Sequence, residues 1–148
     1  MKYFLIICLS FTLISISMSN AFSQTKLNHM AVYVKDLKKS GEFYSEVLGL
    51  EEVEEPFKDG LHIWYKLGEE STLHLIEGPW KELVFTKNNH LCLSVADLDG
   101  FIENLKERGI TFENVPGDKN VVNVRADGVK QIYFQDPTGY WIEINDEY

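Results

Sequence analysis

The chain has little cysteine and little positive charge. Its two cysteines are Cys8 and Cys92, and Cys8 lies in an apolar stretch that we expect to be removed, so no internal disulfide is expected afterwards. Lys and Arg number 14 against 23 Asp and Glu, which gives a formal net charge of −9. This charge repels phosphate backbones and anionic lipids, so we expect neither a nucleic-acid partner nor a membrane partner. It suits a binder of small molecules or cations.

Long apolar runs are also scarce. The chain has one, at residues 3–18, directly after Lys2. The segment SNAFSQ follows, with Ala21 and Ser23 at the −3 and −1 positions of an expected cut before Gln24. The run is shorter than a membrane span of roughly 20 residues, and no basic stop follows it. We predict a signal peptide at residues 1–23 and an exported protein, periplasmic or secreted; an uncleaved anchor is the alternative.

Residues 24–148 fit a single domain in which one unit occurs twice. Module one (residues 27–77) begins with LNHMAVYVKDL, and module two (residues 89–146) begins with NHLCLSVADL. Each opens with an alternating strand, followed by a helix with an aspartate cap (Asp36 or Asp97) and a terminal glycine (Gly49 or Gly109). Three short strands then follow, EEVEEPF, LHIWYKLG and STLHLIEG in module one and TFENV, VKQIYFQ and GYWIEIN in module two, where 116–128 is an extra loop. The sequence therefore predicts an α+β fold of tandem βαβββ modules.

Alternation along the strands sorts the side chains between two faces. The face expected to pack under the helices carries Met30, Val32, Val34, Leu73, Leu75, Leu91, Leu93, Val95, Tyr140, Ile142 and Ile144. The opposite face carries four metal-capable residues, namely His29 and His74 in module one and His90 and Glu143 in module two. The separations within the modules are 45 and 53 residues, and the extra loop accounts for the difference.

A shared cleft would bring the four residues together if the two sheets faced each other about a pseudo-twofold axis. Three imidazoles and a carboxylate would bind one divalent transition metal, such as Zn, Ni, Fe or Mn. A metal would also explain Glu143, because an unpaired carboxylate between two core residues is costly. A lone histidine on a strand is usually structural, and His62 has no counterpart in module two, so we do not expect His62 to be a ligand.

With these motifs the chain resembles the vicinal oxygen chelate superfamily, which includes glyoxalase I, fosfomycin-resistance thiol transferases, methylmalonyl-CoA epimerase, extradiol dioxygenases and bleomycin-binding proteins. The resemblance lies in NHMAVYVKDLKKSGEFYSEVLGL, NHLCLSVADL and FQDPTGYWIEIND. It implies paired modules that form an incomplete barrel around a metal, and a substrate that chelates the metal through adjacent oxygens. It also implies a homodimer whose cleft is built from one chain or from two.

The resemblance assigns His29, His90 and Glu143 to positions at which metal-using members keep ligands. His74 occupies the fourth position, where glyoxalase I has glutamate and epimerases often have glutamine. In glyoxalase I two carboxylates handle the proton, whereas this chain has only one at these positions, Glu143. Glutathione is mainly a cytosolic thiol, so export also argues against a lactoylglutathione substrate.

We predict a divalent-metal-dependent, glyoxalase-like lyase or isomerase that acts on a small oxygenated substrate, with Glu143 as the general base. Trp141 and Tyr33, with Trp64, are candidate pocket walls, and Arg125 is a candidate clamp for a substrate carboxylate. Simple packing is the alternative for the aromatic residues, and a solvated loop position is the alternative for Arg125.

Three other functions stay open. One is an extradiol-type Fe(II) dioxygenase that uses His29, His90 and Glu143, although His74 would then take a coordination site that catechol and dioxygen need. Another is a module of the same fold that binds a small molecule or a metal without turnover. The third is a thiol transferase, against which export again counts.

Overall fold

The structure, a computed structural model, describes residues 25–79 and 81–148. The predicted signal peptide at residues 1–23 lies outside these ranges. The first sheet has the order β1-β4-β3-β2, and the second has the order β5-β8-β7-β6. The elements of module one are β1 (His29–Val34), α1 (Leu37–Glu46), β2 (Glu52–Val53), β3 (His62–Leu67) and β4 (Ser71–Glu77). Those of module two are β5 (His90–Ser94), α2 (Leu98–Glu107), β6 (Asn123–Val124), β7 (Lys130–Gln135) and β8 (Trp141–Asn145). The predicted α+β class with tandem βαβββ modules is confirmed.

Both helices begin and end where their local sequence dictates. Oδ1 of Asp36 accepts a hydrogen bond from the Lys39 amide at 3.0 Å, and Oδ1 of Asp97 accepts one from the Gly100 amide at 2.9 Å. These caps satisfy amides that have no partner inside the helix. Just past the helix ends, Gly49 and Gly109 have φ values of +67° and +69°, a left-handed conformation that costs glycine little.

The strand registers of the two modules are equivalent around the candidate ligands. Strands β1 and β4 run parallel, as do β5 and β8, while β3 and β7 run antiparallel to β4 and β8. His74 pairs with Trp64 on β3, and Glu143 pairs with Tyr133 on β7. The duplication therefore places an aromatic ring beside the candidate ligand on the last strand of each module.

One predicted strand is wrong. TFENV at residues 111–115 forms only isolated bridges, in which Glu113 pairs with Lys119 and with Tyr133. The Asn114 side chain accepts hydrogen bonds from the amides of Gly117 and Asp118 and so closes a turn. The edge strand β6 instead forms inside the segment that the sequence suggests is an extra loop.

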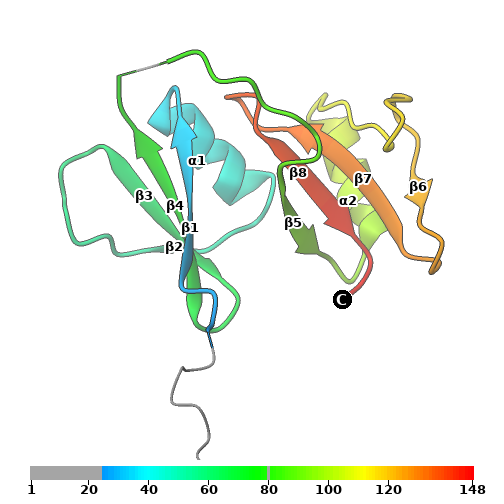
Figure 1. Ribbon diagram of the computed structural model, residues 1–148, viewed down its shortest axis with the longest axis horizontal. Helices are drawn as coiled ribbons and strands as arrows, with labels where there is room; N and C mark the ends of the chain where they lie inside the picture. The colour runs from blue at the N-terminus through cyan, green and yellow to red at the C-terminus, as the bar shows by residue number, and fades with distance from the viewer. Residues whose placement is uncertain (1–24, 80) are drawn as a thin grey trace, which may run out of the picture.

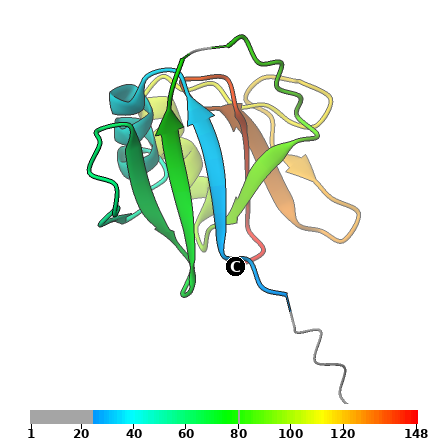
Figure 2. The same ribbon diagram turned by 60° about the vertical axis from the view of Figure 1, so that its left-hand side comes forward.

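The helices occupy the space between the two sheets. Each covers the apolar face of its own sheet, and both meet in one core that contains Val32, Val34, Leu73, Leu75, Leu91, Tyr140, Ile142 and Ile144 from the predicted inner faces. Phe134 of β7 contacts Phe43 of α1 at 6.2 Å and Phe101 of α2 at 6.0 Å between ring centroids. An ion pair of 3.1 Å joins Arg108 to Glu46 at the ends of the helices. Figure 1 shows α1 between the sheets and α2 behind β7 and β8, and Figure 2 shows the helices together behind the first sheet.

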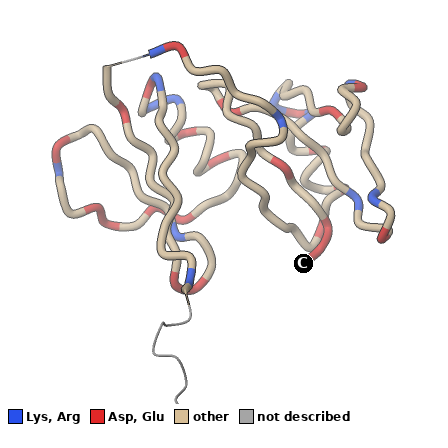
Figure 3. The backbone as a smooth tube through the Cα atoms, in the orientation of Figure 1, with Lys and Arg blue, Asp and Glu red and all other residues tan. Residues whose placement is uncertain are grey.

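Acidic residues occur along the backbone of both modules (Figure 3), as the composition suggests. Among the described residues, no helix has the length and apolar character that crossing a membrane requires.

Candidate functional site

The face of the first sheet that points away from the helices carries a stack of three aromatic rings. Trp64 lies 3.8 Å from His74 with ring planes 5° apart, and His74 lies 4.5 Å from His29 with planes 7° apart. Alternation on adjacent strands brings the three rings to one face. They line a pocket of about 540 Å³ together with Phe57 and His62, among other residues. We call this pocket the module-one site.

Neighbouring polar groups already contact the imidazoles of the module-one site. Nδ1 of His29 donates to Oδ1 of Asn28 at 2.7 Å, so in the neutral imidazole Nε2 of His29 is the nitrogen with a lone pair. Nε2 of His74 shares a hydrogen bond of 2.7 Å with the Thr72 hydroxyl. Partial burial lowers the pKa of His74, and the nearby His29 and His62 lower it further, so His74 favours its neutral form. Two parallel rings do not aim their in-plane lone pairs at one point, so joint coordination requires one ring to turn.

The corresponding face of the second sheet carries His90 and Glu143, which form the module-two site. Nε2 of His90 lies 3.1 Å from Oε2 of Glu143. Nδ1 of His90 donates to the Lys87 carbonyl at 2.7 Å, and because a carbonyl only accepts, that nitrogen holds the proton. In the neutral imidazole, Nε2 therefore turns a lone pair towards a carboxylate. Either a proton or a cation must lie between these two atoms to make the contact favourable.

Glu143 is buried, with 6% of the residue exposed, and a polar network surrounds it. The Tyr133 hydroxyl donates to Oε2 at 2.5 Å, and Nδ2 of Asn145 donates to Oε1 at 3.2 Å. Burial alone would raise the pKa of Glu143. The hydrogen bonds from Tyr133, Asn145 and Cys92, together with His90, outweigh burial and hold that pKa below its usual value. Glu143 is therefore an anionic group in a mostly buried place.

Burial and Glu143 also act on two neighbouring groups. Partial burial of the sulfur, and then the Glu143 carboxylate, raise the pKa of the Cys92 thiol to about 12, although the residue as a whole is exposed. The same two causes raise the pKa of Tyr133, so its hydroxyl stays protonated and can donate. The module-two site is thus a carboxylate held by neutral donors.

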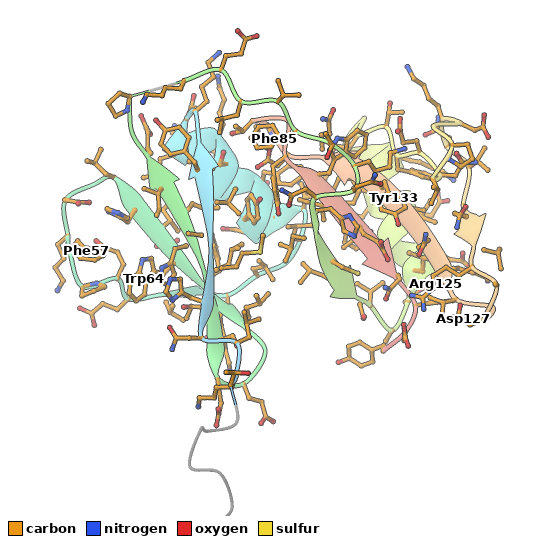
Figure 4. The ribbon with its side chains drawn as sticks, in the orientation of Figure 1. Phe57, Trp64, Phe85, Arg125, Asp127 and Tyr133 are labelled. Atoms are coloured by element: carbon orange, nitrogen blue, oxygen red, sulfur yellow. The ribbon has the colours of Figure 1, made fainter. Side chains whose placement is uncertain are left out.

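Within one chain the four candidate ligands form two separate pairs, His29 with His74 and His90 with Glu143. In the described part of the chain, no group of three or more His, Cys, Asp or Glu side chains is arranged to hold a metal ion. The physical reason is the position of the helices, which lie between the sheets and leave the two histidine-bearing faces pointing outwards. In Figure 4, Trp64 of the module-one site and Tyr133 beside the module-two site lie on opposite sides of the molecule.

The three candidate substrate contacts lie in different places. Tyr33 donates its hydroxyl to the Pro79 carbonyl. Trp141 lines a separate pocket of about 470 Å³ beside Tyr133. Nζ of Lys87 lies 5.1 Å above the Trp141 ring, within reach of a cation–π contact. Trp141 is therefore close to the module-two site, whereas Tyr33 is tied to the chain that leaves β4.

Arg125 is engaged by two carboxylates, Asp127 at 2.5 Å and Glu147 at 3.3 Å. Its side-chain hydrogen bond with Asp127 is the main cause that raises its pKa. A substrate carboxylate would have to compete with these two partners for the guanidinium. The structure thus gives Arg125 a local structural role in the loop before β7 (Figure 4).

Beside the candidate ligands lie Tyr133, which sequence reasoning missed, and His62, which it considered only as a metal ligand. Tyr133 alternates with the core residues of β7, and its pairing with Glu143 depends on a register that composition does not reveal. His62 lies in the module-one site with His29 and His74. The available signal was its alternation with Trp64 on β3, which places both side chains on the outer face.

Comparison with known proteins identifies the family. The sequence profile of the glyoxalase/bleomycin resistance protein/dioxygenase superfamily matches residues 26–144. Glyoxylase I 4 from Arabidopsis thaliana is 26% identical over 131 residues, which span 84% of this chain and 72% of the relative. Lactoylglutathione lyase from Pseudomonas aeruginosa is 28% identical over 148 residues, which span 79% and 80% of the two chains. The crystal structure of a putative glyoxalase family protein from Bacillus anthracis superposes with a TM-score of 0.67 at 23% identity and covers 85% of this chain and 98% of the other. The chain belongs to the glyoxalase/bleomycin resistance protein/dioxygenase superfamily.

Proposed function

We propose that two copies of this chain form a homodimer in which the module-one site of each copy faces the module-two site of the other. In each of the two clefts, His29 and His74 of one chain and His90 and Glu143 of its partner would hold one divalent transition metal: Zn, Ni, Fe or Mn. The protein would then be a glyoxalase-like lyase or isomerase for a small oxygenated substrate.

The observation that carries this proposal is the division of the candidate ligands into two outward-facing pairs. Two protein ligands leave a transition metal with most of its coordination sphere open, whereas three or four are typical of a protein site. A twofold axis that places one pair against the other yields two identical sites and uses every candidate ligand. The partner copy would therefore complete each site.

The residues present suit a metal in their chemistry. Imidazole and carboxylate are ligands of all four candidate ions. The Nδ1 hydrogen bond of His90 to a backbone carbonyl is the second contact that metal-bound histidines usually make. When bound, the ion would polarise a substrate carbonyl or hydroxyl. Tyr133 and Asn145 would keep Glu143 anionic and oriented, and Glu143 would accept a proton from the substrate.

Relatives support the reaction class and not a particular substrate. Two curated relatives are lactoylglutathione lyases, from Pseudomonas aeruginosa and Schizosaccharomyces pombe. Here the fourth candidate ligand is His74 rather than a carboxylate. We therefore propose isomerisation or lyase chemistry on a substrate with adjacent oxygens, without assigning glutathione as its carrier.

Subunit mixing tests the shared cleft directly. His74→Ala removes a module-one ligand and Glu143→Gln removes the module-two acid. When the two inactive variants are mixed and exchange subunits, each heterodimer has one doubly altered cleft and one unaltered cleft. Random exchange should therefore restore about a quarter of the wild-type sites in a shared-cleft dimer. A cleft within one chain predicts no recovery, so a mixture that stays inactive despite verified exchange contradicts the proposal.

Elemental analysis tests the ligands separately. Protein purified without added metal should contain about one transition-metal ion per chain, since a twofold dimer with two shared clefts has one site per chain. His74→Ala should retain much less metal, whereas Glu143→Gln should keep part of it and lose turnover. Glu103→Gln is the matched control, because Glu103 is exposed and pairs with Lys106 on α2. Unchanged retention in His74→Ala would remove His74 from the site, and full activity in Glu143→Gln would remove Glu143 as the base.

Oxygen consumption separates the two metal-dependent alternatives. An Fe(II) dioxygenase would consume dioxygen in step with product, and a lyase or isomerase would not. Turnover should proceed equally under argon and air. Tight binding without any product would instead favour a binding protein.

A further inference from the structure

His62 lines the module-one site and pairs with Asp59, and the proposed ligand set uses neither residue. Nδ1 of His62 donates to Oδ1 of Asp59 at 2.9 Å. Because a carboxylate only accepts, Nδ1 carries a proton, and in the neutral imidazole Nε2 keeps its lone pair. Among the described residues, Nε2 of His62 makes no hydrogen bond. Nε2 of His62 is thus a nitrogen at the wall of the pocket that can accept a proton.

Local structure fixes this pair in place. Gly60 has a φ of +75° and turns the chain, so that Oδ1 of Asp59 also accepts the Leu61 amide at 2.9 Å. The Phe57 ring packs against the His62 imidazole with 4.9 Å between centroids. The His62 side chain is only 18% exposed, although it belongs to the first residue of β3. Carboxylate and aromatic ring together hold the imidazole in one orientation.

The position of His62 also suits a role beside the candidate ligands. His62 pairs with Ile76, and Trp64 pairs with His74 two residues earlier on β4. Two residues along a strand span about 7 Å and return to the same face. A substrate of a few heavy atoms that is anchored near His74 would therefore reach the His62 imidazole.

We propose that His62, positioned by Asp59, is a second acid–base residue of the proposed enzyme, opposite Glu143 of the partner chain. This inference rests on the proposed function. Nε2 of His62 takes the proton from a hydroxyl-bearing carbon next to a carbonyl, the C–H electrons move into an enediolate, and Glu143 of the partner chain takes the proton of that hydroxyl. The imidazolium, stabilised by Asp59, returns a proton to the neighbouring carbon, and Glu143 returns its proton to the former carbonyl oxygen, so the product is an isomer of the substrate and no oxidant or reductant is needed. His62 would thus replace the acid–base group that is lost where His74 stands.

Proton exchange in D₂O tests the role of His62. The probes are dihydroxyacetone and the hemithioacetal of methylglyoxal with 2-mercaptoethanol, and deuterium incorporation at carbon is followed by NMR with the metal-loaded full chain. His62→Gln should lower the exchange rate by about 100-fold or more, which is the usual contribution of a positioned acid or base. Asp59→Asn should lower it less, through kcat rather than KM. Free imidazole should restore part of the activity of His62→Ala, which a merely structural histidine would not allow.

The control is Glu54→Gln, because Glu54 lies on the same loop, is exposed and pairs with Lys58. Bound metal should be unchanged in all of these variants. Full exchange by His62→Gln would overturn this inference and leave the proposed function intact. Loss of metal in His62→Gln would make His62 a ligand and overturn its role as a base. If the unsubstituted, metal-loaded protein exchanges no proton in either probe, the proposed isomerisation fails, and the role of His62 fails with it.

Discussion

The hydrogen bond from Tyr133 to Glu143 offers a test of the buried network in the metal-free protein. Tyr133→Phe removes a hydroxyl that lies 2.5 Å from a carboxylate oxygen in a residue that is 6% exposed. The change also removes the acceptor that Nε2 of Gln131 contacts at 2.9 Å. A hydrogen bond to a buried charged group contributes about 1.5–3 kcal/mol, so we expect the free energy of unfolding to fall by about 2 kcal/mol.

Urea unfolding in the presence of a chelator measures this loss. Tyr148→Phe is the matched control, because Tyr148 is 89% exposed, and its effect should stay within about 0.5 kcal/mol. The deficit of Tyr133→Phe should depend on pH. The folded-state pKa of Glu143 lies below its usual value, so its stabilising contribution is present above pH 4.5 and is lost as the pH falls through the folded-state pKa.

The difference between Tyr133→Phe and the unsubstituted protein should therefore be largest near pH 7. It should shrink towards the lowest pH at which both proteins remain folded. A deficit no larger than that of Tyr148→Phe would refute the reasoning. A deficit that stays constant as Glu143 takes up its proton would refute the attribution to a charged partner.

Three further predictions concern the core, a turn and the free thiol. Phe134→Ala should lower the free energy of unfolding by about 3–5 kcal/mol and keep one cooperative transition, since Phe134 contacts both helices. Tryptophan fluorescence monitors the unfolding, and two separate transitions would contradict the shared core. Burial raises the pKa of Asp136, so ionisation of Asp136 costs stability as the pH rises above 3.8. Asp136→Asn can keep the contact with the Tyr44 hydroxyl. In urea unfolding, this variant should gain stability relative to the unsubstituted protein between about pH 3 and about pH 7. Cys92 should react with iodoacetamide at pH 8 about three orders of magnitude more slowly than a thiol of pKa 9, and Glu143→Gln should speed the reaction.

Local pattern was enough to predict the modules and the faces of their strands. Alternation separates Val32 and Leu75 from His29 and His74 because successive side chains of a strand point to opposite faces. Aspartate caps and left-handed glycines mark the helix ends because the backbone groups they satisfy belong to the same segment. The prediction failed at residues 111–115, where the side chain of Asn114 closes a turn that strand propensity does not register.

The amino-acid sequence by itself determined two βαβββ units, each with a pair of metal-capable side chains on the face opposite its helix. Tertiary structure alone decided that these faces point apart. Phe134 contacts Phe43 of α1 and Phe101 of α2, and these contacts hold the helices between the sheets. It also decided that Tyr133 meets Glu143 and that His62 enters the module-one site. The alternation of apolar and polar residues indicates to which face of its own strand a side chain points. The position of one module relative to the other depends on contacts between residues far apart in the chain, and no local pattern contains them.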